Sequence, residues 1–265
     1  MKALFTVGTE EQIKLNDILF LEIGKEYAAY AFMDQEHKAF DLVEYISFNE
    51  MECEEKIIST IDKLKTFNPN RVIISSAFKE ALLIPQNYFS ENHSFIADIY
   101  SPLNFKTLDD KIAEWQIITS YGIPESIFNA LQSTFVSTEY QHVYTCSVKR
   151  NNEIESFISV HFNTHYFRVM IKKNNQVQLA QTYSYKTPLD VIYYLLKLSY
   201  EFSLSQSEVL LIVSGLVESD SALYQEIKNY FLNVEFSKAT EYFIPKNDHP
   251  HYYFSSLYNL AECVL

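Results

Sequence analysis

The sequence predicts an α/β protein of two halves, each a mixed sheet of β-β-β-α-β order with flanking helices. Three observations support this prediction. The 265 residues suffice for two domains of about 130 residues each. Short apolar runs alternate with longer amphipathic stretches, as strands and helices do within one α/β domain. The same element order occurs twice over similar lengths, from Ile18 to Val72 and from Phe157 to Val209.

The first half contains four predicted strands and one predicted helix. The strands are short apolar runs bounded by polar turns, at 18–23, 27–32, 39–48 and 71–78. The run at 18–23 is almost continuously apolar, which is typical of a strand buried on both faces. Residues 50–67 carry apolar side chains at helical spacing, and Asn49 with the acids after it favours a helix N-terminus there.

The second half repeats this order. Its four predicted strands lie at 157–162, 166–171, 177–185 and 208–216. Pro188 suits the first turn of a helix that runs to about residue 203. Ser219 and Asp220 are predicted to cap a further helix over 221–231.

The segment between the repeats predicts two helices, at 109–120 and 124–136, and then a strand at 141–148. Asp109 and Asp110 are interpreted as acids at a helix start. A charged, polar run then suits a crossing turn, so the predicted domains are 1–148 and 149–265. Residues 254–263 are predicted to form a helix that docks on the body.

Charge and composition exclude several classes of partner. The net charge is −13, and lysine and arginine are not clustered as a phosphate backbone would require, so nucleic acid is excluded. No apolar run approaches the roughly 20 residues that span a bilayer, and the first residues predict no secretory signal. Three widely spaced cysteines without a C-x-x-C pattern favour free thiols in a reducing compartment. We therefore expect a cytoplasmic protein without membrane insertion.

Aromatic residues are abundant, and glycine is scarce. The chain has 20 Phe and 20 Tyr, which either fill the cores or form a tyrosine-rich contact surface. It has only four glycines, where average usage would supply about 18. Since glycine lets a backbone fold closely around a phosphate, this shortage argues against nucleotide chemistry.

The duplicated order nevertheless resembles the actin-like ATPase superfamily. Residues 21–32 and 160–171 resemble its two phosphate loops, and 210–231 resembles its adenosine motif and the helix that follows. This resemblance implies two ribonuclease-H-like halves with nucleotide held between them. The chain is similar to pilus-assembly and cell-division actin-like proteins of bacteria, and to an uncharacterised bacterial family with a degenerate version of the fold.

The chain departs from the superfamily where phosphate would bind. The resemblance implies an aspartate on the magnesium side of each loop, followed by glycines whose N–H groups reach phosphate oxygens. In the first loop Glu22 takes the acid position, and Gly24 is the only glycine. In the second, His161 replaces the acid and Asn163 begins a turn without glycine, while the third motif keeps Gly215. We expect these to be vestigial positions with no cofactor.

Lys25 is the main argument for a retained ligand, because a lysine in the first loop could contact a phosphate. The alternative interpretation is a solvated turn residue beside Glu26. If Lys25 does bind phosphate, the cofactor would be ATP with magnesium.

Other catalytic chemistry finds little support. His161 and His165 are four residues apart, but they fall on a predicted strand and turn, so we expect no metal site. The sequence contains no nucleophile elbow, no Walker motif and no G-x-G-x-x-G. We therefore expect no catalytic residues.

The leading prediction is a non-enzymatic scaffold or regulatory protein-interaction module with an unknown protein partner, with a homo-oligomer as a possibility. The main alternative is a nucleotide-responsive switch that binds ATP weakly through Glu22, Lys25 and Gly215. A third class is an enzyme that acts on a small molecule in an interdomain cleft.

Overall fold

The computed structural model describes residues 3–14, 17–34, 36, 38–90, 95–100, 104–150, 154–238, 244 and 247–265. The chain divides into two compact units. The first includes Met1–Lys149, Thr240–Asp248 and Leu257–Leu265, and the second includes Arg150–Ala239 and His249–Ser256. The division at Lys149 adjoins the predicted boundary, but Leu257–Leu265, which we expected in the second half, belong to the first unit.

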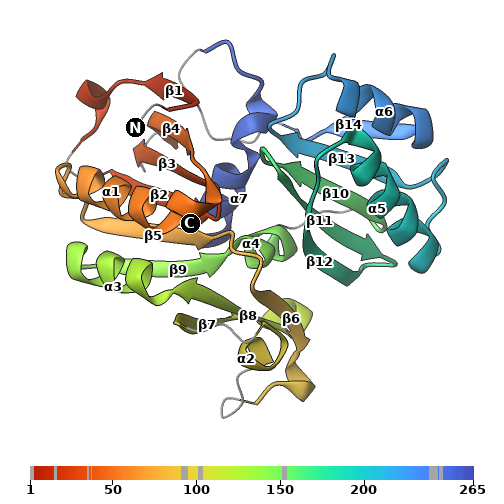
Figure 1. The fold of residues 1–265 in the computed structure, drawn as a ribbon, viewed down its shortest axis with the longest axis horizontal. Helices are drawn as coiled ribbons and strands as arrows, with labels where there is room; N and C mark the ends of the chain where they lie inside the picture. Colours follow the sequence, from red (N-terminus) through yellow and green to blue (C-terminus); the bar gives the residue numbers. More distant parts are fainter. Residues whose placement is uncertain are drawn as a thin grey trace. The chain divides into compact units, whose positions relative to one another are not determined.

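The first unit is built on a six-stranded mixed sheet in the order β1-β4-β3-β2-β5-β9 (Figure 1). Its strands are β1 (Phe5–Gly8), β2 (Ile18–Gly24), β3 (Tyr27–Asp34), β4 (Ala39–Ser47), β5 (Arg71–Ser76) and β9 (Thr138–His142). β2 runs antiparallel to β3 and parallel to β5. Every residue of β2 and β3 is buried, as continuous apolar runs predict for strands covered on both faces.

The predicted helix at 50–67 forms η2 (Glu50–Glu52) followed by α1 (Cys53–Lys65). The Asn49 side chain accepts a hydrogen bond of 2.9 Å from the N–H of Met51, so it caps this helix as predicted. The buried stripe of α1 follows the helical spacing of its apolar residues, and α1 packs beside α3 (Glu125–Thr134).

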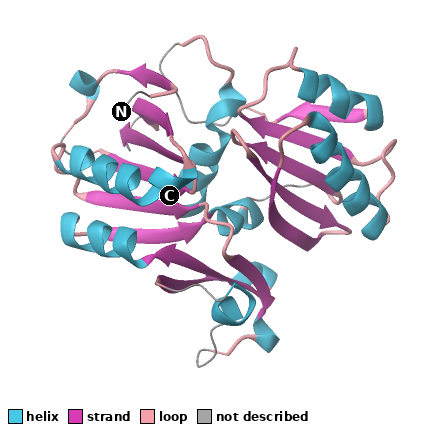
Figure 2. Cartoon of the chain, in the orientation of Figure 1, coloured by secondary structure: helices cyan, strands magenta, loops and turns pink. Residues whose placement is uncertain are grey.

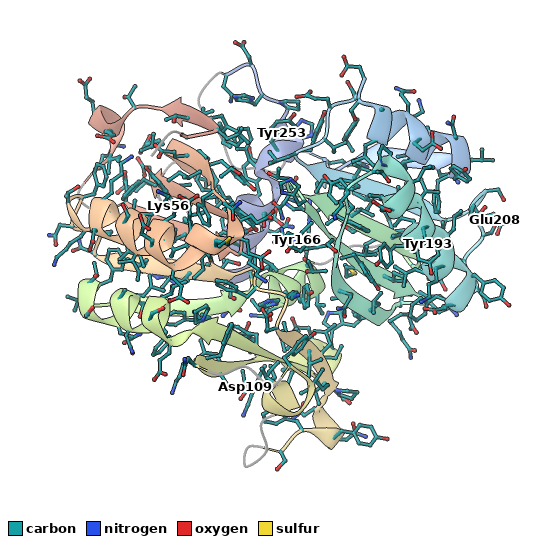
Figure 3. All side chains as sticks on the ribbon, in the orientation of Figure 1. Lys56, Asp109, Tyr166, Tyr193, Glu208 and Tyr253 are labelled. Carbon is teal, nitrogen blue, oxygen red and sulfur yellow. The ribbon has the colours of Figure 1, made fainter. Side chains whose placement is uncertain are left out.

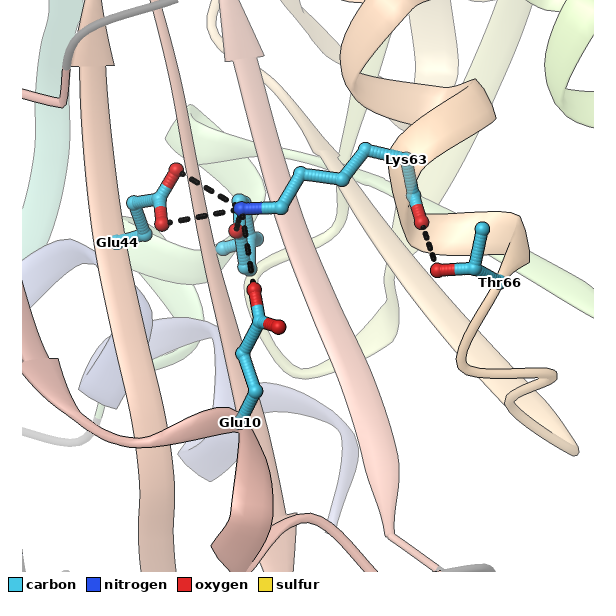
Figure 4. Close-up of polar contacts among 5 residues, drawn as sticks. Glu10, Glu44, Lys63 and Thr66 are labelled. Carbon is cyan, nitrogen blue, oxygen red and sulfur yellow. Dashed lines mark hydrogen bonds and ion pairs between the residues drawn. The ribbon is translucent and has the colours of Figure 1, made fainter.

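Lys63 ties α1 to the sheet (Figure 4). Its ammonium donates to the Tyr30 hydroxyl at 2.8 Å and lies 3.3 Å from Glu44 Oε2 and 3.5 Å from Glu10 Oε1. Burial acts to lower the pKa of Lys63, but the hydrogen bond to Tyr30 and the charge of Glu44 raise it overall. The lysine therefore stays charged and joins α1, β3, β4 and η1 (Glu10–Gln12).

The prediction of a helix at 109–120 was wrong. This segment holds the second half of one strand and the first half of the next in an antiparallel sheet of order β6-β8-β7, and the described residues between 81 and 124 form six elements. They are β6 (Ala81–Pro85), η3 (Gln86–Tyr88), α2 (Phe95–Tyr100), β7 (Phe105–Ile112), η4 (Ala113–Trp115) and β8 (Ile117–Pro124). Asp110 is buried within β7, where its carboxylate accepts hydrogen bonds, so it is not an exposed acid at a helix start.

The prediction of a strand at 141–148 was also wrong, although the helix predicted at 124–136 is confirmed as α3. Residues 141 and 142 end β9, and the chain then turns into the short helix α4 (Val143–Lys149). Most of α4 is buried, including Val143, Tyr144, Cys146 and Val148. A helix buried on nearly all sides carries the same continuous apolar run as a buried strand, so periodicity alone could not separate the two.

The second unit repeats the core of the first. Its five-stranded sheet has the order β12-β11-β10-β13-β14, with β10 antiparallel to β11 and parallel to β13. The strands are β10 (Phe157–Phe162), β11 (Tyr166–Lys173), β12 (Gln176–Ser184), β13 (Leu210–Gly215) and β14 (Asn233–Phe236). This order matches β4-β3-β2-β5-β9 strand for strand, so the predicted duplication is confirmed and each copy gains a fifth strand.

Helices α5 (Pro188–Glu201) and α6 (Ala222–Tyr230) pack side by side in the second unit (Figure 2). Thr187 and Asp190 form a capping box at the start of α5, and Pro188 occupies its first turn as predicted. The predicted cap of α6 at Ser219–Asp220 was wrong, because the Ser221 hydroxyl accepts from the N–H of Tyr224 at 3.2 Å.

The end of the chain forms η5 (His251–Phe254) and α7 (Ser255–Val264), which confirms the helix predicted at 254–263. In the second unit the Tyr252 ring stacks on Phe236 with centroids 4.0 Å apart. In the first unit, the centroids of the Tyr258 and Phe40 rings lie 5.7 Å apart with their planes at 60°, and Leu260 is fully buried. Thus η5 completes the second unit, and most of α7 completes the first.

Candidate functional site

Glu22 lies at the carboxyl end of β2, where the resemblance placed the acid of the first phosphate loop. Its side chain is only 1% exposed, and the hydroxyl of Tyr27 donates a hydrogen bond to Oε1. The Glu22 carboxyl group is therefore engaged by a residue on the far side of its own turn.

Gly24 lies under the ring of Tyr27. A Cβ atom built on Gly24 would come 2.5 Å from Cε1 of that ring, so the ring would have to shift to admit a side chain. The Tyr27 ring also stacks on Tyr45, with centroids 5.1 Å apart and planes 5° apart. The glycine therefore makes room for a tyrosine of the chain itself.

Lys25 forms an ion pair with Glu50 of η2. Its side chain is about one-third exposed, and its ammonium faces a carboxylate supplied by the helix that follows β4. The structure thus brings Glu22, Gly24 and Lys25 together in one turn, as predicted, but each of them contacts a neighbouring side chain.

His161 lies near the carboxyl end of β10, opposite Ser214 of β13. Its Nδ1 is 3.0 Å from the Ser214 hydroxyl, and that hydroxyl also lies 3.4 Å from the carbonyl oxygen of Val160. Burial, and then the charge of Arg168, hold the pKa of His161 well below its usual range. A neutral imidazole stands where the resemblance implied a carboxylate.

Asn163 begins the second turn. Its N–H donates to the carbonyl of Tyr166 at 2.8 Å, and its own carbonyl accepts from the Tyr185 hydroxyl at 2.9 Å. The rings of Phe162 and Phe167 lie 6.0 and 5.8 Å from that of Tyr185. Both backbone polar groups of Asn163 are therefore paired within the turn and its aromatic neighbours.

Gly215 ends β13 with φ of +82°, a conformation that favours glycine. A Cβ atom here would lie 2.2 Å from the carbonyl oxygen of Phe162. The same carbonyl accepts the N–H of Leu216 at 2.8 Å. Contact between two strand ends thus accounts for this glycine without any ligand.

Within the second unit, the structure brings His161, Asn163 and Gly215 together where β10 and β13 end side by side. Two residues of the site were not predicted from the sequence: Tyr27, whose hydroxyl donates to the Glu22 carboxyl group, and Tyr185, whose hydroxyl donates to the carbonyl of Asn163. The available signal was an aromatic residue directly after the first turn, but sequence does not show where its ring points.

Over the part of the chain that the structure describes, no group of three or more His, Cys, Asp or Glu side chains could hold a metal ion. In the same residues, no helix combines the length and apolar character needed to cross a membrane.

The sequence model of a family described as Protein of unknown function (DUF3822) matches residues 9–234. No curated protein matches the chain.

Solved structures match over most of the chain. A Bacteroides thetaiotaomicron VPI-5482 protein of unknown function with an actin-like ATPase fold has a TM-score of 0.73 at 14% identity, and the match covers 84% of this chain and 91% of that one. The PilM-PilN type IV pilus biogenesis complex matches with a TM-score of 0.63 at 10% identity, over 95% of this chain and 100% of that one. An AlfA filament bound to AMPPNP matches with a TM-score of 0.50 at 9% identity, over 94% of this chain and 96% of that one. The chain therefore has the actin-like ATPase fold, as predicted.

Proposed function

This chain belongs to the family described as Protein of unknown function (DUF3822), and we propose that it uses its actin-like ATPase fold as a non-enzymatic scaffold or regulatory protein-interaction module. One observation carries the proposal: each turn that resembles a phosphate loop is engaged by a tyrosine of the chain itself. Tyr27 covers Gly24 and bonds to Glu22, and Tyr185 bonds to the carbonyl of Asn163.

The chemistry of phosphate binding supports this proposal. A phosphate loop needs backbone N–H groups that point at ligand oxygens, yet the N–H of Asn163 is already paired with Tyr166. Magnesium prefers oxygen ligands, and neutral His161 offers none. Lys25, the residue we considered for a phosphate contact, pairs with Glu50. We therefore propose that the protein holds no cofactor and hydrolyses no ATP.

The outer face of α5, formed by Leu189, Tyr193 and Tyr200, is the contact surface that we propose for the partner. These side chains are 61%, 61% and 86% exposed, and their spacing places them on one side of the helix (Figure 3 labels Tyr193). Exposed tyrosines are typical of protein interfaces. With a net charge of −13, the chain favours a basic partner. PilM-PilN is a complex and AlfA a filament, so similar folds do assemble with proteins.

A thermal shift experiment tests the absence of nucleotide. A ligand at 100 times its dissociation constant adds about 2.7 kcal/mol of stability, which for a chain of this size raises Tm by roughly 5–10 °C. We expect no such rise with millimolar magnesium-ATP. A rise of that size would overturn the scaffold proposal.

The competing function is a nucleotide-responsive switch, which the AlfA filament bound to AMPPNP supports by its fold. Under that alternative, Tyr27 would have to leave Gly24 before a phosphate could enter the first turn. Tyr27→Ala would then increase magnesium-ATP binding. Under the scaffold proposal, neither this variant nor the wild type gains stability from the nucleotide.

The contact surface is tested with a double variant, Tyr193→Ser with Tyr200→Ser, and a matched control, Tyr88→Ser. Tyr88 is also largely exposed, at 71%, but lies in the first unit. We expect the wild type and the control to bind the same basic protein, identified by mass spectrometry, and the double variant to lose it. Equal binding by all three would exclude this face.

A further inference from the structure

Strand β12 ends the sheet of the second unit (Figure 1). Among the residues that the structure describes, it pairs with β11 alone. Of its nine residues only Ala180 is buried, whereas six of the eight residues of β11 are buried. The register on β11 shifts once, at Lys172, and is regular from Leu179 to Ser184. The outer side of this regular segment therefore presents backbone groups of the kind that a further strand binds.

The repeated core shows which kind of strand this position accepts. In the first unit β4 corresponds to β12, and β1 continues the sheet beyond β4 as an antiparallel strand. The row of paired residues followed outward from Glu22 reaches Tyr45 of β4 and then Phe5 of β1. The matching row, followed outward from His161, reaches Thr182 of β12, and no strand that the structure describes continues it. The second unit thus has no described counterpart of β1.

β12 also lacks the features that protect edge strands from pairing. Natural sheets blunt their edges with charged side chains, proline or very short strands. Each other end strand that the structure describes has one of these features: β1 and β14 have four residues each, β9 carries Glu139, β6 ends at Pro85 and β7 has four charged side chains. β12 has nine residues without charge, proline or glycine. An edge of this length and composition favours the addition of another strand.

We propose that β12 of a second copy of this chain adds to this edge, antiparallel about a two-fold axis at Gln181. In that register Leu179 lies opposite Tyr183 of the other copy, and Ala180 lies opposite Thr182. The first pair joins an aliphatic to an aromatic side chain on one face of the sheet, and the second joins a small to a β-branched side chain on the other face. Such cross-strand pairs are the main source of stability in antiparallel sheets. The two Gln181 side chains would meet at the axis, where each amide can both donate and accept.

Charge favours a second copy as the occupant. The chain carries a net charge of −13, so two copies repel each other unless the segments in contact are neutral. β12 is neutral along its whole length, and the pair therefore places no like charges opposite each other. A two-fold contact of this kind uses the same edge in both copies and closes at a dimer. It does not involve the face of α5 that we propose for a basic partner, and it does not depend on that proposal.

Sedimentation equilibrium of the full chain over a concentration series tests the proposal. We expect the wild type to form a weak, concentration-dependent dimer, because the added strands bury a small area. Gln181→Lys would place two ammonium groups opposite each other and should raise the dissociation constant of the dimer at least about tenfold. Gln206→Lys makes the same substitution at an exposed position of the second unit outside β12, and it should leave the dissociation constant unchanged.

A charge swap separates repulsion at the axis from misfolding, and circular dichroism checks that each variant folds. Gln181→Glu alone should also weaken the dimer, whereas an equimolar mixture of Gln181→Glu and Gln181→Lys should restore it as a mixed dimer. The double variant Tyr193→Ser with Tyr200→Ser should dimerise like the wild type, so the two interfaces fail separately.

A wild type that is monomeric at about 200 μM would overturn the proposal and leave this edge to a strand of another protein. A dimer that neither charge at Gln181 weakens, or a mixture of the two charged variants that stays monomeric, would also overturn it.

Discussion

The hydroxyl of Tyr27 pairs with the Glu22 carboxyl group in the first turn. It is the polar tip of a ring that packs over Gly24 and against Tyr45, and it donates to a carboxyl group that is almost fully buried. Loss of one partner from a buried polar pair costs more than the pair contributes, because the remaining group stays in the interior.

Tyr27→Phe keeps the ring and removes this hydrogen bond. We expect the free energy of unfolding to fall by about 1–3 kcal/mol. Urea denaturation measures the change, and Tyr200→Phe, which alters an exposed hydroxyl, is the matched control with an expected change within about 0.5 kcal/mol. Equal stability of Tyr27→Phe and the wild type would show that Glu22 does not depend on Tyr27.

Gly215→Ala tests whether backbone contact accounts for that glycine. A side chain there would combine an unfavourable positive φ with a clash against the carbonyl of Phe162. We expect a loss of more than about 2 kcal/mol in unfolding free energy. In the control Gly122→Ala, the new Cβ would meet the movable ring of Phe105, so the loss should be smaller. Similar losses in both would argue against a special role for the backbone of Gly215.

The candidate positions were predictable from sequence, but their partners were not. Glu22, Gly24 and Lys25 were expected in one turn because they are adjacent in the chain. His161 and Gly215 were expected at one site because the resemblance assigned both to the nucleotide cleft, and they lie where β10 and β13 end side by side. The direction of the Tyr27 ring depends on Tyr45 of β4, a contact that pairs distant residues and leaves no local pattern.

At the level of elements, the three-stranded sheet is anchored by Asp110 of β7. Its carboxylate accepts from the Tyr121 hydroxyl at 3.1 Å, and from the N–H of His142 and the Thr145 hydroxyl, both at 2.7 Å. Burial raises the pKa of Asp110 to about 6, although these hydrogen bonds oppose the rise. One carboxylate thus joins β7 to β8, β9 and α4.

This raised pKa predicts a pH dependence of stability. The folded state binds the Asp110 proton more tightly than the unfolded state, so the stabilising contribution is present below about pH 4 and is lost as pH rises through about 6. From pH 4 to 7 the wild type should lose up to about 3 kcal/mol relative to Asp110→Asn. Urea denaturation of both proteins across this range measures the difference. A difference independent of pH would contradict the assignment.

Asp110 also explains why residues 109–120 were predicted to form a helix. Only Asp110 and Ile112 are buried in β7, so its strand alternation is weak, and adjacent acids favour a helix start by local rules. Gln116 closes the turn in the left-handed region, at φ of 52°, without the glycine that usually marks such a turn. By contrast, strands of the repeated cores were predictable because burial on both faces makes them continuously apolar.

At the scale of the whole molecule, the first unit is discontinuous in sequence. Leu257–Leu265 belong to it although the second unit intervenes. Leu260 is fully buried on α7, so Leu260→Ala should cost about 2–5 kcal/mol.

That loss should appear in a specific place. Hydrogen exchange of Leu260→Ala should quicken in β2–β5, while β10–β13 keep their protection, because the affected core is that of the first unit. Leu195→Ala, at a fully buried position on α5, is the reciprocal control and should affect β10–β13 first. Faster exchange confined to the second unit in Leu260→Ala would contradict the division.

This discontinuity bears on how the chain is made. A ribosome delivers Met1–Lys149 well before Leu257–Leu265, so the nascent first unit must wait through the synthesis of the second for the helix that covers Phe40. Domains usually mature in the order of translation. Here the earliest-made unit is the last to be completed, so we expect its apolar surface to stay uncovered during that interval.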